Sequence, residues 1–331
     1  MDNSIPPLPK ERLSFSHRLS CFLFLWLLKA LAALYLLYLR LIHRPQPGTQ
    51  PTLTKRYACR PSLEARIFFP RSYSAAQRPL LPLYLNIHGG GFALGDATVD
   101  DPFCSAWAAR TGMLVVSLNY RKAPLHPFPT ATLDVAEVVR GVLADASLPI
   151  DPSRIVIGGF SAGGTLALSA SQLPGLKGRI KAAVVYYPIV DFSHPPDEKL
   201  AARPYTDGPS ESLERTAWWL DWGYVNVGQN RRDPLLSPVY AASEELPPWI
   251  YMVGAQWDML RLEAQQMIHA LAGLEERVGA EQEEDFQVGR YKWTLARGCP
   301  HGFAHKSRQS EVTRSIYEEA YQWLKQAQIL S

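Results

Sequence analysis

The sequence predicts an α/β fold in which a mostly parallel sheet carries helices on both faces. Short apolar runs alternate along the chain with segments whose apolar residues recur at helical spacing. In addition, two glycine-rich motifs each follow one of these apolar runs. The runs typical of strands are 66–70, 83–87, 113–118, 154–157, 182–187, 249–253 and 291–295. Helices are expected over 131–145, 162–172 and 260–274.

Composition places the 331-residue chain among globular proteins. Its hydrophobic content of 47% with 20% charged residues excludes disorder over the whole chain. The net charge of +3 comes without long basic runs, so nothing indicates a nucleic-acid partner. The four cysteines show no C-x-x-C pair and are scattered along the chain, which favours neither a zinc site nor a disulfide framework; they are Cys21, Cys59, Cys104 and Cys299.

The first element is an apolar helix over 21–39, which lies between Arg18 and Arg40. At about 1.5 Å of rise per residue the two arginines are roughly 33 Å apart, close to the thickness of a hydrocarbon core. Lys29 is the single charge inside, and it would cost about 2.5–3.5 kcal/mol at the bilayer centre. We expect residues 1–45 to form a membrane anchor that contacts membrane lipid.

Other readings of this helix compete with a membrane span. A cleaved signal peptide is disfavoured because the apolar run is too long and no small-x-small cleavage site follows it promptly. An interfacial helix, or a helix that caps the catalytic domain, stays open. Basic residues on both sides of the run leave the orientation open as well.

The rest of the chain is expected to form one domain over 46–331. A proline-rich stretch at 44–52 separates it from the anchor. Residues 192–245 interrupt the alternation with many prolines and one aromatic helix candidate at 212–225. An insertion of this kind between two strands predicts a lid over an apolar pocket, with an ordinary packed excursion as the alternative.

The central motif is Gly159-Phe160-Ser161-Ala162-Gly163, between the run at 154–157 and the helix at 162–172. The pentapeptide alone is a weak signal, but its position strengthens it. A strand must turn abruptly into a helix to present the serine at the apex, and glycines two before and two after remove Cβ atoms that would clash. This setting predicts Ser161 as a nucleophile.

A second motif, His88-Gly89-Gly90-Gly91-Phe92, ends another strand. Backbone N–H groups of Gly89 and Gly90, together with that of Ala162, are expected to form an oxyanion hole for a tetrahedral intermediate. Removing one such donor costs about 2.7–4 kcal/mol of barrier. A flexible turn is the alternative. His88 is expected to brace the loop rather than to transfer protons.

A serine nucleophile needs a base that is held by an acid. His301 is the best base, since it lies in a Gly/Pro loop just after the last strand-like run. Asp258 is the best acid, because it follows the strand at 249–253. His305 is the alternative base, although it is expected on the surface, and Asp191 is the alternative acid.

Several motifs together resemble the hormone-sensitive-lipase-like branch of the α/β-hydrolases, from about residue 65 onward. They are HGGGF (88–92), YRKAPLHPFPTATLD (120–134), GGFSAGG (158–164), DPLLSP (233–238), DMLRLE (258–263) and HGF (301–303). The order Ser, Asp, His along the chain is also that of an α/β-hydrolase. The resemblance implies an α/β-hydrolase fold with an eight-stranded sheet and a helical cap, no cofactor and no metal, and hydrolysis of short or medium acyl esters.

The N-terminal anchor ahead of such a domain looks like the arylacetamide deacetylases of that branch. This resemblance implies a single-pass protein of the endoplasmic reticulum membrane. Two residues depart from the family pattern. Phe160 stands where an acidic residue usually precedes the nucleophile, and Leu262 stands where a second carboxylate is frequent. Neither departure removes Ser161, Asp258 or His301, so catalysis is still expected.

The sequence therefore predicts a carboxylic ester hydrolase that forms an acyl-enzyme on Ser161. Its expected substrate is a small, lipophilic short- to medium-chain ester. An acyltransferase would need the same residues and stays open as an alternative. A non-catalytic ligand-binding receptor on the same fold is the second alternative, and the retention of His301 argues against it.

Overall fold

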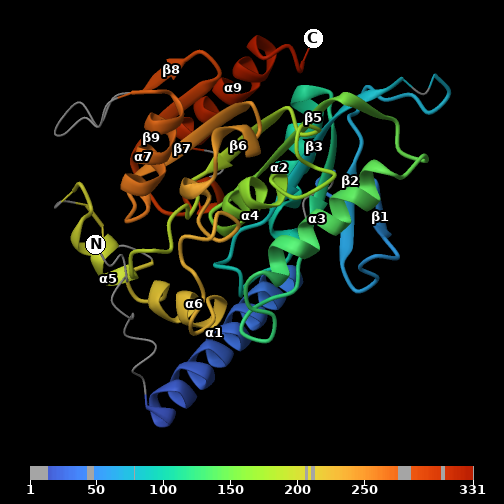
Figure 1. Ribbon diagram of the computed structural model, residues 1–331. Coiled ribbons are helices and arrows are strands. Elements are labelled where there is room, and N and C mark those ends of the chain that lie inside the picture. Colours follow the sequence, from blue (N-terminus) through green and yellow to red (C-terminus); the bar gives the residue numbers. More distant parts are fainter. Residues whose placement is uncertain are drawn as a thin grey trace.

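The computed structural model describes residues 14–42, 48–77, 79–205, 208–209, 213–274, 285–306 and 310–330. Over these residues a nine-stranded sheet runs through the molecule in the order β1-β2-β4-β3-β5-β6-β7-β9-β8 (Figure 1). The central strands from β4 to β9 are parallel to their neighbours, whereas β1, β2 and β8 pair antiparallel at the two edges. The predicted fold class is confirmed.

Each of the seven predicted runs overlaps one strand. The strands are β1 (Leu53–Arg56), β2 (Glu64–Phe68), β3 (Leu81–Ile87), β4 (Leu114–Leu118), β5 (Ile150–Phe160), β6 (Ala182–Tyr186), β7 (Trp249–Trp257), β8 (Phe286–Val288) and β9 (Tyr291–Pro300). The sheet thus has one strand more than the eight expected. The sequence pattern did not predict β1 and β8, because edge strands of three or four residues carry too few apolar side chains to show a period.

The three predicted helices correspond to α3, α4 and α7, while α2 and α9 were not expected. The helices are α1 (Phe15–Ile42), α2 (Asp101–Thr111), α3 (Thr130–Leu143), α4 (Ala162–Ser171), α5 (Pro196–Ala201), α6 (Ala217–Tyr224), α7 (Arg261–Leu271), α8 (Phe303–Lys306) and α9 (Glu311–Gln326). Short 3₁₀ turns, η2 to η4, cover Ala97–Asp100, Pro238–Tyr240 and Ser243–Glu245.

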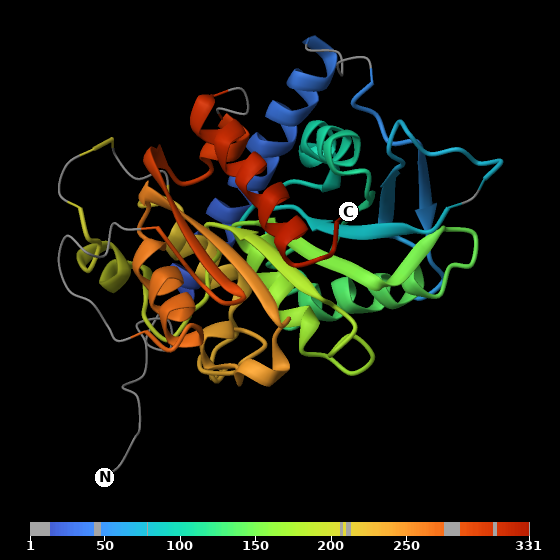
Figure 2. The same ribbon diagram turned by 90° about the horizontal axis from the view of Figure 1, so that it is seen from above.

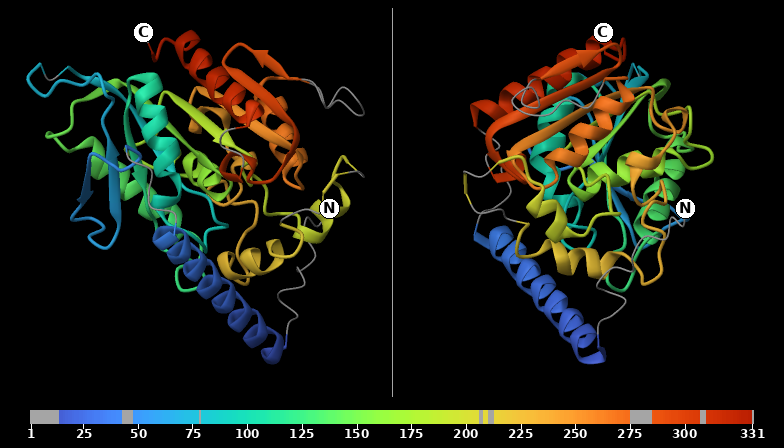
Figure 3. Two further views of the ribbon diagram at one scale, coloured as in Figure 1. Left: turned by 180° about the vertical axis from the view of Figure 1, so that it is seen from behind. Right: turned by 60° about the vertical axis from the view of Figure 1, so that its left-hand side comes forward.

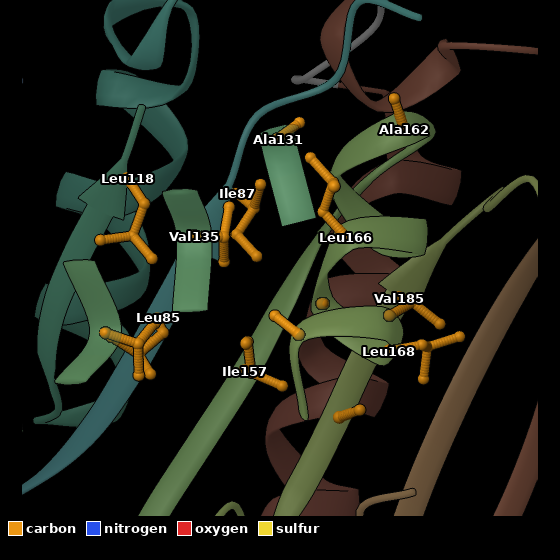
Figure 4. Close-up of a cluster of buried hydrophobic side chains, with 14 of the residues drawn as sticks. Leu85, Ile87, Leu118, Ala131, Val135, Ile157, Ala162, Leu166, Leu168 and Val185 are labelled. Carbon is orange, nitrogen blue, oxygen red and sulfur yellow. The ribbon is translucent and has the colours of Figure 1, made fainter. Parts of the chain in front are cut away.

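Helices cover both faces of the sheet, as Figure 2 shows. On one face α3, α4 and α7 pack over the central strands, and Figure 4 shows Val135 of α3 and Leu166 of α4 beside Ile87 of β3. The opposite face is covered by α2 and α9, which contribute Trp107 and Trp323. Strands buried on both faces are apolar along their whole length, and for this reason the sequence shows them as continuous runs.

Two parts of the chain lie outside these layers, near the carboxyl ends of the parallel strands: the segment between β6 and β7, and the helix α1. The chain between β6 and β7 carries α5 and α6, and the predicted helix at 212–225 is present as α6 over Ala217–Tyr224. Figure 3 shows α1 running along the edge of the molecule beside α6, and the two helices are in contact. Parts of the predicted anchor (1–13 and 43–45) and of the predicted lid (206–207 and 210–212) lie outside the described residues.

Candidate active site

Ser161 lies in the sharp turn between β5 and α4. Its φ of 52° is in the left-handed region, and its backbone N–H donates a hydrogen bond to the carbonyl oxygen of Tyr186 at 2.8 Å. A Cβ on Gly159 would lie 2.4 Å from the carbonyl oxygen of Ile87, and a Cβ on Gly163 would lie 2.0 Å from the same atom. Both distances are far below van der Waals contact, so the turn requires glycine at these two positions.

The structure brings Ser161, His301 and Asp258 into one hydrogen-bonded chain. The Nε2 atom of His301 is 3.0 Å from Oγ of Ser161, and its Nδ1 atom is 2.7 Å from Oδ2 of Asp258. Asp258 is fully buried, and its Oδ1 atom accepts the N–H of Leu260 at 2.9 Å. With the Nδ1 proton donated to the carboxylate, Nε2 is left as the acceptor for the serine proton.

These residues converge because parallel strands end at the same edge of the sheet. Ser161 follows β5, Asp258 follows β7 and His301 follows β9. Ser161 and His301 are each 7% exposed, so little water screens the hydrogen bond between them. The arrangement can deprotonate the serine hydroxyl and return the proton to a leaving group.

The glycine loop lies directly against the serine turn. A Cβ on Gly89 would be 2.8 Å from the carbonyl oxygen of Phe160 and 3.5 Å from Cβ of Ser161. Gly90, with a φ of 113°, adopts a backbone conformation that favours glycine. Ala162 is the first residue of α4, so its N–H has no acceptor one turn earlier in the helix. Gly89 and Ala162 therefore lie beside Ser161, and Gly90 follows Gly89 in the same loop.

His88 is buried behind the loop. Its Nδ1 atom donates to the carbonyl oxygen of Gly89 at 2.6 Å, and its ring stacks on Tyr120 with centroids 4.5 Å apart. Burial, reinforced by the nearby charge of Lys122, lowers the pKa of His88 to about 3. An uncharged imidazole in this position holds the loop, as expected from the sequence.

The two alternative residues have other partners. His305 Nε2 lies 2.5 Å from Oδ1 of Asp100, and its Nδ1 atom lies 3.3 Å from the hydroxyl of Tyr187. The expected surface position of His305 is wrong, since its side chain is only 23% exposed. Asp100 is fully buried and needs a cationic or hydrogen-bonding partner, which His305 supplies. Asp191 instead accepts the N–H of Ser193 at 2.7 Å.

Phe160 points away from the cavity, toward the face of the sheet that α2 and α9 cover. Its ring stacks on Tyr186 at 4.8 Å and meets Phe103 and His305 edge-on at 5.0 Å and 4.5 Å. Successive side chains of a strand point to opposite faces, so the residue before the nucleophile belongs to the layer beneath it. An acidic side chain here would lie among aromatic rings.

A cavity of about 50 Å³ lies over Ser161. The glycine loop supplies Gly91 and Phe92 to its wall, and the apolar side chains Phe192, Leu220 and Met259 surround it. The sequence predicted a lid over 192–245 but did not single out these residues. No local pattern marks them, because they meet only when α6 lies over the strand ends.

A buried ion pair next to the cavity was also missed. Lys199 Nζ lies 2.6 Å from Oε2 of Glu263, with side chains 9% and 10% exposed. The other oxygen of Glu263 accepts the N–H of Val190 at 2.9 Å. Leu262 stands where the family often has a carboxylate, and Glu263 provides one at the next position. Within the described ranges, no three His, Cys, Asp or Glu side chains gather as a metal site would need.

Comparisons with known proteins agree with this architecture. A family model described as the alpha/beta hydrolase fold matches residues 84–288. Lipase 2 of Moraxella sp. (strain TA144) is 29% identical over 280 residues, which are 71% of this chain and 59% of that protein. Neutral cholesterol ester hydrolase 1 of Mus musculus is 31% identical over 172 residues, which are 48% of this chain and 41% of that protein. The chain thus spans less than two thirds of these curated relatives.

A solved structure is similar over most of the chain. The esterase of Pyrobaculum calidifontis is 26% identical, and the match covers 84% of each chain with a TM-score of 0.66.

Proposed function

The chain belongs to the α/β-hydrolase family, in its hormone-sensitive-lipase-like esterase branch, and on this premise we propose that it hydrolyses carboxylic esters. Ser161 is the nucleophile, His301 the general base and Asp258 the acid that orients it. The observation that carries the proposal is the hydrogen-bonded chain from Asp258 through His301 to Ser161, with both contacts at 3.0 Å or less.

In the first half of the reaction, Oγ of Ser161 attacks the ester carbonyl carbon while Nε2 of His301 takes its proton. The carbonyl electron pair moves onto oxygen, and the N–H groups of Gly89, Gly90 and Ala162 stabilise that charge. When the intermediate collapses, the C–O bond to the alcohol breaks. The departing oxygen takes the proton from Nε2, and an acyl-enzyme remains.

In the second half, a water molecule attacks the acyl carbon and gives its proton to Nε2 of His301. Collapse of this second intermediate breaks the bond to Ser161, whose Oγ regains the proton, and the carboxylic acid leaves. Asp258 remains ionised throughout and stabilises the imidazolium that forms in each half.

The cavity supports a short acyl group on the substrate. Its volume of about 50 Å³ exceeds the roughly 10–15 Å³ that one water molecule needs, so the cavity has room for a small group. Phe192, Leu220 and Met259 make this space apolar. In this proposal residues 192–245 act as the cap of a domain over 46–331, and they select a lipophilic ester with a short to medium acyl chain.

Membrane association through α1 belongs to the same proposal. Among the described residues, one helix is long and apolar enough to cross a membrane, and its window Arg18–Tyr38 has a mean hydropathy of 2.1. Residues 1–45 would be the anchor segment, and the resemblance to arylacetamide deacetylases favours the endoplasmic reticulum.

Hydrolysis of p-nitrophenyl acetate, together with fluorophosphonate labelling, tests the chemistry. The wild-type protein should turn over the ester and take the label on Ser161, and Ser161→Ala should lose both. Ser169→Ala, which replaces a buried serine farther along α4, is the matched control and should keep both. A folded wild-type protein with neither labelling nor turnover would refute the proposal.

An acyl-length series tests the substrate class. Acetate and butyrate esters should be hydrolysed with higher kcat/KM than palmitate esters, because the cavity is small. A preference for palmitate over butyrate would contradict a short acyl pocket. The roles proposed for Ser161, His301 and Asp258 would still stand.

A further inference from the structure

One face of α1 is docked on the catalytic domain along the middle of its apolar segment. The side chains that are buried or half-buried fall at helical spacing on a single stripe: Cys21, Leu25, Leu28, Lys29, Ala32 and Leu36. From Cys21 to Leu36 the stripe is about 22 Å long at 1.5 Å per residue. This covers most of the length of a hydrocarbon core.

The contacts along this stripe are specific. The ring of Phe24 stacks on Trp219 of α6 with centroids 4.0 Å apart. Leu25 is fully buried, and a Cβ on Gly223 of α6 would lie 2.4 Å from Cδ2 of Leu25. Lys29 Nζ donates a hydrogen bond to the carbonyl oxygen of Ala123 at 2.6 Å. The charge inside the apolar segment therefore faces protein.

The remaining surface of α1 is apolar and exposed. Apart from Phe24, which packs on Trp219, its large side chains between 37% and 81% exposed are Phe15, Leu19, Phe22, Leu23, Trp26, Leu27, Leu31, Leu34, Tyr35, Leu37, Tyr38, Leu41 and Ile42. Exposed apolar area on this scale marks an interaction surface. Because its side chains are almost all aliphatic or aromatic, the surface fits lipid acyl chains.

Beside the stripe, the surface where α1 meets the catalytic domain carries polar groups. A cavity of about 240 Å³ lies between α1 and residues 93–96, which follow the glycine loop, and Lys29, Asp96 and Lys122 contribute to its wall. If α1 crossed a bilayer in its docked position, these ionisable groups and the backbone around Ala123 would lie at the depth of the hydrocarbon. Ionisable groups are costly at that depth, and irregular backbone exposed to lipid does not occur.

We propose that α1 lies in the plane of one membrane leaflet, with the catalytic domain on its docked face and its exposed apolar face in the acyl chains. An interfacial helix needs a polar face opposite its apolar face. In this protein the catalytic domain takes the place of the polar face. The inference rests on the membrane association of the proposed function, and it replaces the single-pass arrangement expected from the sequence.

This arrangement places the cap at the lipid surface. The helix α6 contacts α1 through Trp219 and Gly223, and the same helix supplies Leu220 to the cavity over Ser161. A second connection runs through Ala123, whose N–H donates to the carbonyl oxygen of Phe92 in the glycine loop at 3.0 Å. An ester dissolved in the leaflet therefore has the cap of the active site as its nearest protein surface.

The sidedness of the two ends of α1 tests the inference in the full-length protein. Ser16→Cys, Gln50→Cys and Ala76→Cys place single reporters in the first turn of α1, after α1 and on the catalytic domain, all at exposed positions. Sealed vesicles of uniform orientation, prepared from expressing cells, are treated with a membrane-impermeant maleimide before and after permeabilisation. Mass spectrometry of the reporter peptides separates them from the native cysteines.

An in-plane helix should give the same labelling of all three reporters, on the same side of the membrane. Labelling of Ser16→Cys only from the side opposite to Gln50→Cys and Ala76→Cys would overturn the inference in favour of a membrane span. Failure of the protein to float with the vesicles would overturn it as well. Turnover of p-nitrophenyl acetate by the same vesicles reports the hydrolase separately, so a failure of the proposed chemistry is distinguishable from a failure of the topology.

Discussion

Asp258 does not line the substrate cavity, yet the proposed reaction depends on it because it sets the tautomer of His301. Asp258→Asn should keep the fold and lower kcat by about 10⁴-fold with little change in KM, since the amide presents a donor to the wrong side of the imidazole. Steady-state kinetics on p-nitrophenyl acetate measures the effect. Asp191→Asn replaces the alternative acid and is the control; a larger loss in that variant would contradict the assignment.

His88 should make the protein sensitive to acid. Its pKa is about 3 in the folded protein and near 6.5 in the unfolded chain. Between these values the unfolded chain binds a proton that the folded protein does not. The stability that the neutral imidazole contributes is therefore complete above pH 6.5 and is lost as the pH falls toward 3, by up to about 1.4 kcal/mol per pH unit.

Urea unfolding between pH 7 and about pH 4 checks this dependence. His88→Gln should flatten the decline in the free energy of unfolding over this window. His194→Gln removes a histidine whose side chain is 62% exposed and should leave the decline unchanged. If both variants follow the wild-type curve, His88 is not the group responsible.

At the scale of elements, the Lys199–Glu263 ion pair joins α5, in the proposed cap, to α7, which packs on the sheet. Lys199→Met would leave a carboxylate buried without a cation, and removing one partner of a buried pair costs about 3–5 kcal/mol. The variant should lose this much free energy of unfolding at neutral pH. The loss should shrink in acid, because burial already raises the pKa of Glu263 and protonation removes the unpaired charge.

The double variant Lys199→Met/Glu263→Gln is the control for that measurement. It removes both charges, so it should recover most of the stability that the single variant loses. A single variant as stable as the wild type would show that water compensates the carboxylate and that the pair does not tie the cap to the sheet.

Elements differ in how far the sequence predicted them. The seven predicted strands stand out as apolar runs, and α3, α4 and α7 carry apolar residues at helical spacing. By contrast, α9 was not predicted, although its apolar residues recur at helical spacing; its large buried side chains are Ile316, Trp323 and Leu324. The short edge strands β1 and β8 depend on pairing with a neighbour, which no local pattern encodes.

At the scale of the whole molecule, the exposed face of α1 should decide whether the protein binds membranes. Leu34→Glu/Leu41→Glu places two charges on side chains that are 62% and 69% exposed, away from the docked stripe. Vesicle flotation should fall sharply, since burying a charge in lipid is unfavourable, while p-nitrophenyl acetate turnover should persist. Leu80→Glu alters a leucine of the catalytic domain that is 59% exposed, and this variant should float like the wild type. Unchanged flotation of the double variant would assign the membrane contact elsewhere.

The sequence by itself determined the fold class and the residues proposed for the chemistry. The serine turn depends on glycines two positions away, and the acid and base follow strands whose ends must meet, so local sterics and strand order were sufficient. Only the tertiary structure decided that His305 pairs with Asp100 across 205 residues, that Glu263 meets Lys199, and that Lys29 faces Ala123 rather than lipid. These pairs join segments that are remote in the chain, and packing alone brings them together. In the same way, α1 reads in sequence as a membrane span, but the domain beside it supplies the polar face that an in-plane helix requires.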